Sequence, residues 1–200
     1  MPGEVVLAAL GHVWLTLQPL SVPMAVMGGL ALATWKVVRA TRDVDILVGI
    51  GAGEVAPILS RLSAVGVRPK RSPPVNELGE LKVVQLQYEV PEAFVEVQVD
   101  LLLGASEYHR AALARRTPVQ LPDLDFSIAV LACEDLILHK LLAGRVIDRV
   151  DVAGLLRANR GALDFGYLGR WADRLQCLGA LREVGREAWP GEPLPAEISG

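Results

Sequence analysis

Apolar residues recur along the chain with two periods, one typical of helices and the other of strands. Between Val5 and Leu17 they recur every three or four residues, which predicts an amphipathic helix rather than a signal segment. Similar patterns predict further helices over residues 30–35, 54–65, 106–115, 134–143, 148–158 and 164–186, the last with a break at Gly179.

Strands are predicted where short β-branched or alternating runs occur, over residues 24–27, 44–48, 82–89 and 94–103. In the last run the apolar Val95, Val97, Val99 and Leu101 alternate with Glu96, Gln98 and Asp100. One face of this strand is therefore apolar and the other polar. Residues 68–79 contain three prolines and Gly79, which predicts a surface loop.

The order of these elements predicts an α/β (α+β) fold with a mixed sheet, flanked by helices and followed by a C-terminal helical bundle. A break near Pro122 separates a core over residues 1–121 from a helical part over residues 122–200, which we expect to pack on the core. The chain has 200 residues, and its 52% hydrophobic content can fill such a core and excludes a disordered protein.

Charge and composition narrow the function classes further. The net charge of −3 excludes a protein that coats nucleic acid with a broad basic surface. Cys133 and Cys177 form neither a metal-ligand cluster nor a disulfide framework. No apolar run reaches the roughly 20 residues that a membrane span needs. We therefore expect a cytoplasmic protein that does not interact with membranes.

Acidic residues gather at one end of the predicted strands. Asp43 and Asp45 are two residues apart at the start of a strand, so both carboxylates lie on the same face. Asp100 lies on the polar face of another strand and joins them if the strands are neighbours. Such a group of carboxylates is typical of a site for Mg²⁺ or Mn²⁺. Alternatively, Asp45 pairs with Arg39 or Arg42 and the acids are structural.

Gly28 and Gly29 stand between a predicted strand and a predicted helix. Residues without a Cβ let backbone N–H groups approach a phosphate closely, although a tight turn also accounts for a Gly-Gly pair. The segment GGLALATWKVVRATRDVDILV resembles the active-site signature of the polymerase-β-like nucleotidyltransferase superfamily, and VEVQVDLL resembles the strand that carries its third carboxylate. RATRDVD and CEDLILHKLLAGRVIDRVDVAGLL are similar to the AbiEii-like and minimal-nucleotidyltransferase branch.

The resemblance implies an enzyme that moves a nucleoside monophosphate from a nucleoside triphosphate to an acceptor hydroxyl. It implies that Asp43, Asp45 and Asp100 hold the cations and carry the catalysis, and that Gly28 and Gly29 seat phosphate oxygens. Four further residues are candidate nucleotide ligands: Arg39, Thr41, Arg42 and Lys140. For these, an ion pair of either arginine with the aspartates, an ordinary strand threonine and a solvated lysine stay open as alternatives.

The acceptor and the biological partner are open at this stage. An RNA end such as that of tRNA, or a protein side chain, fits a toxin–antitoxin or abortive-infection enzyme, and the basic residues Arg68, Lys70 and Arg71 would then guide RNA. A solvated loop accounts for the same residues. The alternatives are a non-enzymatic binding partner of a cognate toxin or antitoxin, and an antibiotic-type enzyme that modifies small molecules.

Overall fold

The computed structural model describes residues 2–78, 81–91, 93–121 and 124–199, and the chain divides into two compact units. The first contains the chain up to Leu30 together with Ala40–Leu131, and the second contains Ala31–Arg39 together with the chain from Ala132 onward. Each unit is described separately below.

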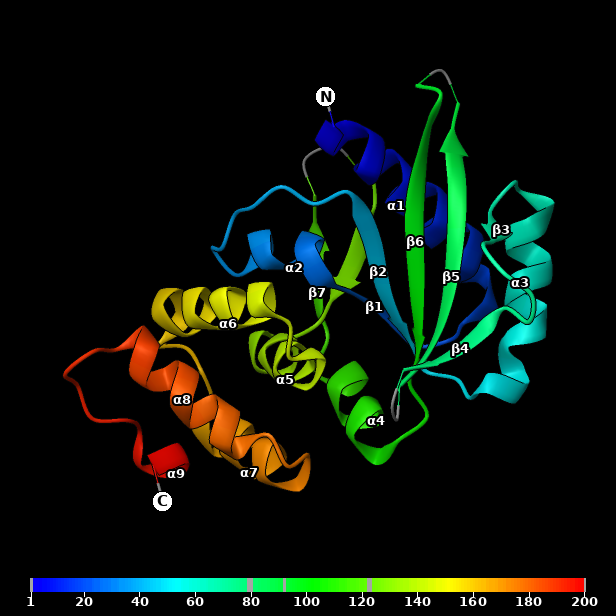
Figure 1. Cartoon of the computed structure of the whole chain (residues 1–200). Helices are drawn as coiled ribbons and strands as arrows, with labels where there is room; N and C mark the ends of the chain where they lie inside the picture. The colour runs from blue at the N-terminus through cyan, green and yellow to red at the C-terminus, as the bar shows by residue number, and fades with distance from the viewer. Residues whose placement is uncertain (1, 79–80, 92, 122–123, 200) are drawn as a thin grey trace. The chain divides into compact units, whose positions relative to one another are not determined.

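The first unit is built on a mixed sheet. Within the described ranges eight strands pair in the order β3-β5-β6-β2-β1-β8-β7, with β4 also paired to β5. The strands are β1 (Met24–Met27), β2 (Asp43–Val48), β3 (Arg68–Pro69), β4 (Val75–Leu78), β5 (Leu81–Val90), β6 (Val95–Leu103), β7 (Thr117–Gln120) and β8 (Ser127–Val130). β2 runs parallel to β6 and β1 to β8, while the other pairs are antiparallel. Figure 1 shows β5 and β6 as the two long strands of this sheet.

The two faces of the sheet differ in chemistry. Side chains alternate between faces, and residues paired in register share a face. One face, which we call the polar face, carries Asp43, Asp45, Gln85, Gln98 and Asp100. The opposite, apolar face is covered by α1 (Pro2–Leu17), which packs on β2, β5 and β6. The His12 ring of α1 stacks on Tyr88 of β5, with 4.3 Å between the ring centroids.

Short helices complete the first unit. They are α3 (Val55–Ala64), α4 (Glu107–Ala114) and the 3₁₀ turns η1 (Gln18–Leu20) and η2 (Ala52–Glu54). The side chain of Ser106 accepts a hydrogen bond from the backbone N–H of His109 and thereby caps α4. Helix α2 (Gly28–Thr34) begins in the first unit and continues into the second.

The second unit is helical. It contains α5 (Cys133–Ala143), α6 (Val146–Asn159), α7 (Phe165–Arg174), α8 (Leu178–Ala188) and α9 (Ala196–Ser199). The segment of residues 35–39 lies against α6, because the Asn159 side-chain amide donates a 2.8 Å hydrogen bond to the carbonyl of Trp35. Arg39 donates to Asp151 of the same helix. Residues 35–39, which precede β2 in the chain, are thus part of the helical unit.

The structure confirms the predicted mixed fold with a C-terminal helical part, and corrects several details. The boundary expected after residue 121 falls between β7 and β8, which pair with each other, so β8 belongs to the sheet. The second unit resumes at Ala132. Pro122, on which that boundary rested, lies outside the described residues. So does Gly79 of the predicted loop.

Two further predictions are wrong in part. The expected loop over residues 68–79 contains β3 and β4, because Pro69 occupies a two-residue edge strand, where a proline is tolerated. The expected helix over residues 164–186 is two helices, and its break is at Gln176, whose backbone φ is +57°, while Gly179 lies inside α8. Among the described residues, no helix is both long and apolar enough to cross a lipid bilayer.

Candidate active site

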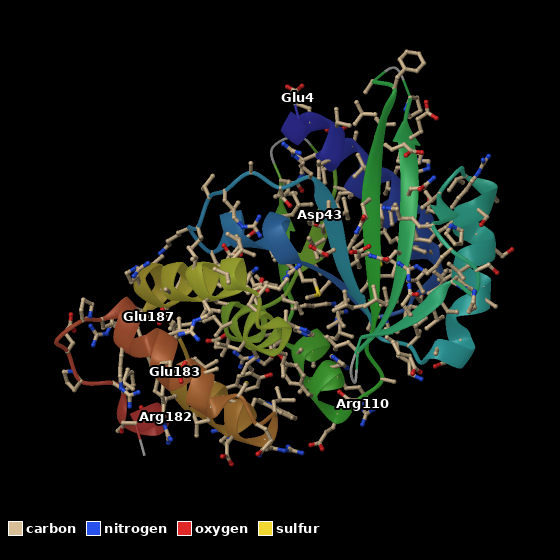
Figure 2. The ribbon with its side chains drawn as sticks, viewed as in Figure 1. Glu4, Asp43, Arg110, Arg182, Glu183 and Glu187 are labelled. Atoms are coloured by element: carbon tan, nitrogen blue, oxygen red, sulfur yellow. The ribbon has the colours of Figure 1, made fainter. Side chains whose placement is uncertain are left out.

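The candidate active site is the part of the polar face where β2 and β6 run side by side. Asp45 is directly opposite Asp100 in the register of these parallel strands, and Asp43 is opposite Gln98. Figure 2 shows Asp43 at the start of β2. The sequence placed Asp43 and Asp45 on one face of a strand, and the pairing of β2 with β6 adds Asp100 to that face.

Neutral donors hold two of these carboxylates. The Thr41 hydroxyl donates a 2.6 Å hydrogen bond to Oδ1 of Asp43. The side-chain amide of Gln98 donates to both carboxylate oxygens of Asp100, at 3.1 and 2.9 Å. Thr41 thus orients a candidate catalytic carboxylate.

Asp100 has a perturbed acidity. Burial raises its pKa above the ordinary value, and the hydrogen bond from Gln98 opposes this change only in part. The negative charge of Asp43 raises the pKa of Asp100 further, whereas the charge of Lys70 and a hydrogen bond from Gln85 lower it. Asp43 and Asp100 are therefore close enough to repel each other, which is the electrostatic setting that a bound cation relieves.

The backbone of Gly28 lies directly against the side chain of Asp45. Its φ is +63°, a left-handed conformation that glycine adopts without strain. A Cβ at this position would lie 1.8 Å from Oδ2 of Asp45, closer than any two atoms can approach without bonding. The first glycine of the Gly-Gly pair is thus required by the position of Asp45. Gly29, the second, is buried.

The donor set fits a divalent cation in its chemistry. Carboxylate oxygens on one sheet face are the ligands that Mg²⁺ and Mn²⁺ prefer. In the part of the chain that the structure describes, however, no three His, Cys, Asp or Glu side chains stand together as a ready-made metal site. Both oxygens of Asp100 accept from Gln98, so this amide occupies one acceptor position on each oxygen that a cation could otherwise use.

Two predicted nucleotide ligands lie in the second unit with partners of their own. Arg39 donates to both oxygens of Asp151, and Lys140 donates to Asp151 at 2.7 Å and to Asp148 at 3.2 Å. The alternative that Lys140 is a solvated lysine is wrong, since the residue is 4% exposed. The apolar spacing missed this because α5 is buried nearly all round. Arg42, by contrast, is exposed beside Asp43.

Sequence reasoning missed several polar-face residues. Lys70 donates a 2.8 Å hydrogen bond to Gln98, and Arg71 donates a 2.7 Å hydrogen bond to Gln85. The sequence analysis placed these two cations in a loop outside the site. For Gln98, by contrast, a signal was present: the alternation of β6 places it on the same face as Asp100.

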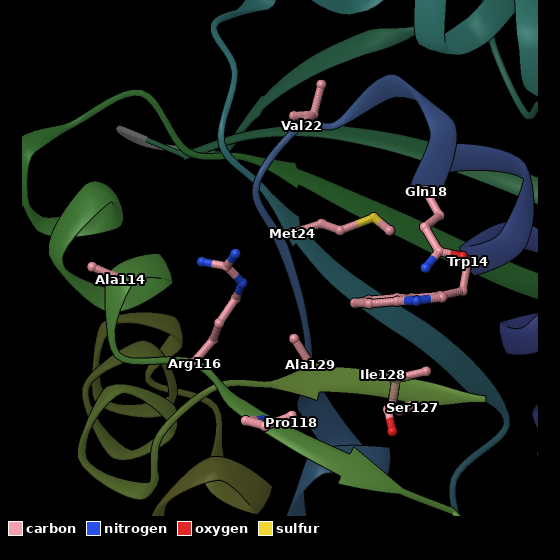
Figure 3. Close-up of a pocket in the computed structure, with 10 residues that line it drawn as sticks. All are labelled: Trp14, Gln18, Val22, Met24, Ala114, Arg116, Pro118, Ser127, Ile128 and Ala129. Atoms are coloured by element: carbon pink, nitrogen blue, oxygen red, sulfur yellow. The ribbon is translucent and has the colours of Figure 1, made fainter.

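A cavity of about 510 Å³ also lies in the first unit (Figure 3). Its lining comes from α1, α4, β1, β7, β8 and the segments between them: Trp14, Gln18, Val22, Met24, Ala114, Arg116, Pro118, Ser127, Ile128 and Ala129. Met24 pairs with Val48, which alternation places on the apolar face of β2. The cavity is therefore separate from the carboxylates.

Comparison with known proteins finds similarity in structure only. No protein-family model matches the chain, and no curated protein matches it. An antigenic nucleotidyltransferase-like protein from Paracoccidioides brasiliensis has a TM-score of 0.50 and 16% identity, over 90% of this chain and 92% of that one. The antibiotic-resistance factor ANT(2'')-Ia has a TM-score of 0.53 and 12% identity, over 94% of this chain and 97% of that one.

At such identities the similarity concerns the fold. The neighbours extend over nearly the whole chain, so both units belong to the shared architecture. The resemblance to the AbiEii-like branch is not tested by these comparisons and stays a prediction. The chain thus has the nucleotidyltransferase-type fold that its Gly-Gly and Asp-x-Asp segments predicted.

Proposed function

We propose that this chain is a metal-dependent nucleotidyltransferase, which moves a nucleoside monophosphate from a nucleoside triphosphate to an acceptor hydroxyl. One observation carries the proposal: Asp45 is in register with Asp100 on neighbouring parallel strands, and Asp43 is close enough to raise the pKa of Asp100. Mutually repelling carboxylates on one face lower the stability of a protein that has no cation to bind. The nucleotidyltransferase-type fold agrees with this reading.

The reaction assigns one role to each carboxylate. The acceptor oxygen forms a bond to the α-phosphorus as the bond from that phosphorus to the bridging oxygen of the leaving pyrophosphate breaks. The hydroxyl proton passes to a carboxylate, for which we assign Asp100. Asp43, held by Thr41, and Asp45, held against Gly28, are fixed as oxygen ligands.

Asp43, Asp45 and Asp100 are the residues that would hold Mg²⁺ or Mn²⁺. A cation bound there neutralises phosphate charge and lowers the pKa of the acceptor hydroxyl. We assign the backbone of Gly28 and Gly29 to the phosphate oxygens, although the side-chain space at Gly28 is filled by Asp45. We assign exposed Arg42 to the phosphates, and we assign Arg39 and Lys140, which both donate to Asp151, to the packing of the second unit.

For the acceptor, we propose an RNA end or a protein side chain, in an enzyme of the toxin–antitoxin or abortive-infection type. The support is the sequence similarity of RATRDVD and of the segment 133–156 to that branch. The structural neighbour ANT(2'')-Ia is an antibiotic-resistance factor, which makes a small-molecule acceptor the second arm of any test. A cognate toxin or antitoxin is the expected protein partner.

The test is transfer of label from α-phosphate-labelled nucleoside triphosphates, in Mg²⁺, to total RNA, total protein and small hydroxylated acceptors in parallel. We expect label in one fraction, and loss of it to background in Asp43→Asn and Asp100→Asn. Glu96→Gln is the matched control, because Glu96 is an exposed acid of the same strand face and hydrogen-bonds to Gln87. Label in none of the fractions, with a cognate partner supplied, would favour the non-enzymatic binding role.

A further inference from the structure

The polar face places two exposed cations next to the neighbours of Asp100. Lys70 donates to the carbonyl oxygen of the Gln98 side chain at 2.8 Å, and the amide of Gln98 donates to Asp100. Arg71 donates to the side-chain oxygen of Gln85 at 2.7 Å, and Gln85 is paired in register with Asp100. Two glutamines thus stand between two positive charges and one candidate catalytic carboxylate.

The sheet fixes the position of this arrangement. The backbone N–H of Lys70 donates a 2.9 Å hydrogen bond to the carbonyl of Gln85, which continues the pairing of β3 with β5 by one residue. Gln85 is itself directly opposite Asp100 in the register of β5 and β6. The two cations are therefore held beside the candidate active site by backbone pairing rather than by a free loop.

The partners of these cations are weak ones for charged donors. In the described residues, the side chains of Lys70 and Arg71 donate to neutral glutamine oxygens. A phosphate adds a negative charge that a glutamine oxygen lacks, and a guanidinium binds a phosphate through two parallel bonds. Both side chains are exposed, so a phosphate group can reach them and replace the glutamine oxygens.

We infer that Lys70 and Arg71 form a phosphate-binding subsite next to Asp100, and that Gln98 and Gln85 connect occupation of this subsite to the position of Asp100. The inference rests on the proposed function, because it assigns the phosphate to a substrate of that site. The phosphate belongs either to the triphosphate of the nucleotide or to the backbone of an RNA acceptor, and the two sources share the same chemistry.

The glutamines give the subsite a consequence for the carboxylate. A phosphate that takes over Lys70 and Arg71 frees the side-chain oxygens of Gln98 and Gln85, which lets both amides turn. When the Gln98 amide leaves the two oxygens of Asp100, all acceptor positions of that carboxylate become available to a cation. Phosphate binding and the release of Asp100 both require the glutamine side chains to move. We therefore expect phosphate binding to favour cation binding at Asp100, and cation binding to favour phosphate binding.

The experiment compares two charge-matched double variants with the wild type. In Lys70→Gln/Arg71→Gln the two cations of the subsite are removed. In Lys82→Gln/Arg110→Gln the same charge is removed elsewhere: Lys82 is on the apolar side of β5, paired with Glu77, and Arg110 is on α4 (Figure 2). Binding of three probes is measured by titration calorimetry: inorganic pyrophosphate, each nucleoside triphosphate with Mg²⁺, and a short single-stranded RNA.

We expect the Lys70→Gln/Arg71→Gln variant to bind pyrophosphate at least about tenfold more weakly than the control variant, since each charge-assisted bond contributes about that factor. A parallel loss with the triphosphates assigns the phosphate to the nucleotide. A loss with RNA, together with a fall of about 0.7 per lost contact in the slope of log affinity against log salt, assigns it to the acceptor. Equal affinities of the two double variants for all three probes, or no binding of any probe, overturns the subsite.

Failure of this subsite is distinguishable from failure of the proposed function. Label transfer that persists in Lys70→Gln/Arg71→Gln with unchanged substrate dependence would overturn the subsite and leave the nucleotidyltransferase intact. Transfer absent from the wild type, with pyrophosphate binding still weakened in this variant, would overturn the proposed function and leave a phosphate-binding face.

Discussion

Two carboxylate clusters in this protein share residue types but differ in their partners. On the polar face of the first unit, Asp43 and Asp100 accept hydrogen bonds from the neutral Thr41 and Gln98. In the second unit, Asp148 and Asp151 are 1% and 2% exposed and belong to an ion-pair cluster with Arg39, Lys140 and Arg145.

The two clusters shift acidity in opposite directions. Burial alone would raise the pKa of Asp148, but the hydrogen bonds and charges of Arg145 and Lys140 outweigh burial and leave its pKa below the ordinary value. Burial and Asp43 raise the pKa of Asp100. The ion-pair cluster is neutralised from within, whereas Asp43 and Asp100 accept from neutral groups and repel each other, which favours an external cation. Charge balance therefore distinguishes the structural aspartates from the candidate catalytic ones.

The largest expected effect comes from removing the central cation of the ion-pair cluster. Lys140→Ala leaves Asp148 and Asp151 buried without the lysine that binds both, and we expect a loss of about 3–5 kcal/mol in the free energy of unfolding. Chemical denaturation of the purified protein measures it. A change within about 0.5 kcal/mol would show that the cluster is not structural and would return Lys140 to the candidate nucleotide ligands.

A second prediction concerns the glycine that packs on Asp45. Gly28→Ala should cost about 1–3 kcal/mol, from the left-handed backbone and from the clash of the new Cβ with the carboxylate. Gly144→Ala is the matched control, because Gly144 has a φ of +65° but the nearest atom to a new Cβ is 3.8 Å away. Denaturation curves of the two variants should differ by the clash alone. Equal losses would mean that Asp45 moves aside freely.

A third, smaller effect tests the exposed end of the ion-pair cluster. Arg145 pairs with Asp148 across 2.7 Å, but its side chain is 70% exposed, so water screens the pair. Arg145→Ala should therefore cost no more than about 1 kcal/mol, far less than Lys140→Ala. Thermal melts of both variants side by side give the comparison. Similar losses would contradict the assignment of the stabilising role to the buried lysine.

The smallest expected effect is a gain in thermal stability. A carboxyl group with a raised pKa in the folded state disfavours folding once the pH rises above that pKa, so Asp100→Asn should raise the melting temperature of the metal-free protein at pH 7. The gain should vanish as the pH falls toward 3.8, the ordinary value, where the wild-type group is protonated as well. The gain is small because Asp100 is only half-buried. A variant that melts lower than the wild type at pH 7 would mark Asp100 as a structural residue.

The local elements of both units were accessible from the sequence because their causes are local. Met24–Met27 is a strand at the predicted residues, and the alternation over β6 correctly separates buried Val97, Val99 and Leu101 from the face of Asp100. Period-two alternation is a property of a single strand, so it needs no knowledge of its neighbours. The short strands β3, β4, β7 and β8 were missed, since, unlike the wholly apolar Met24–Met27, they contain polar residues or proline within two to four residues.

The sequence by itself determined which residues share a face, and it grouped Asp43 with Asp45 on these grounds. Only the tertiary structure decided which strands are neighbours, and thereby brought Asp45 into register with Asp100 and set Lys70 and Arg71 beside that carboxylate. It also decided that Lys140 and Arg39 bind Asp151. Neither hydropathy nor spacing encodes which charged side chains pair, whether the partner is 11 residues away, as for Lys140, or 112, as for Arg39.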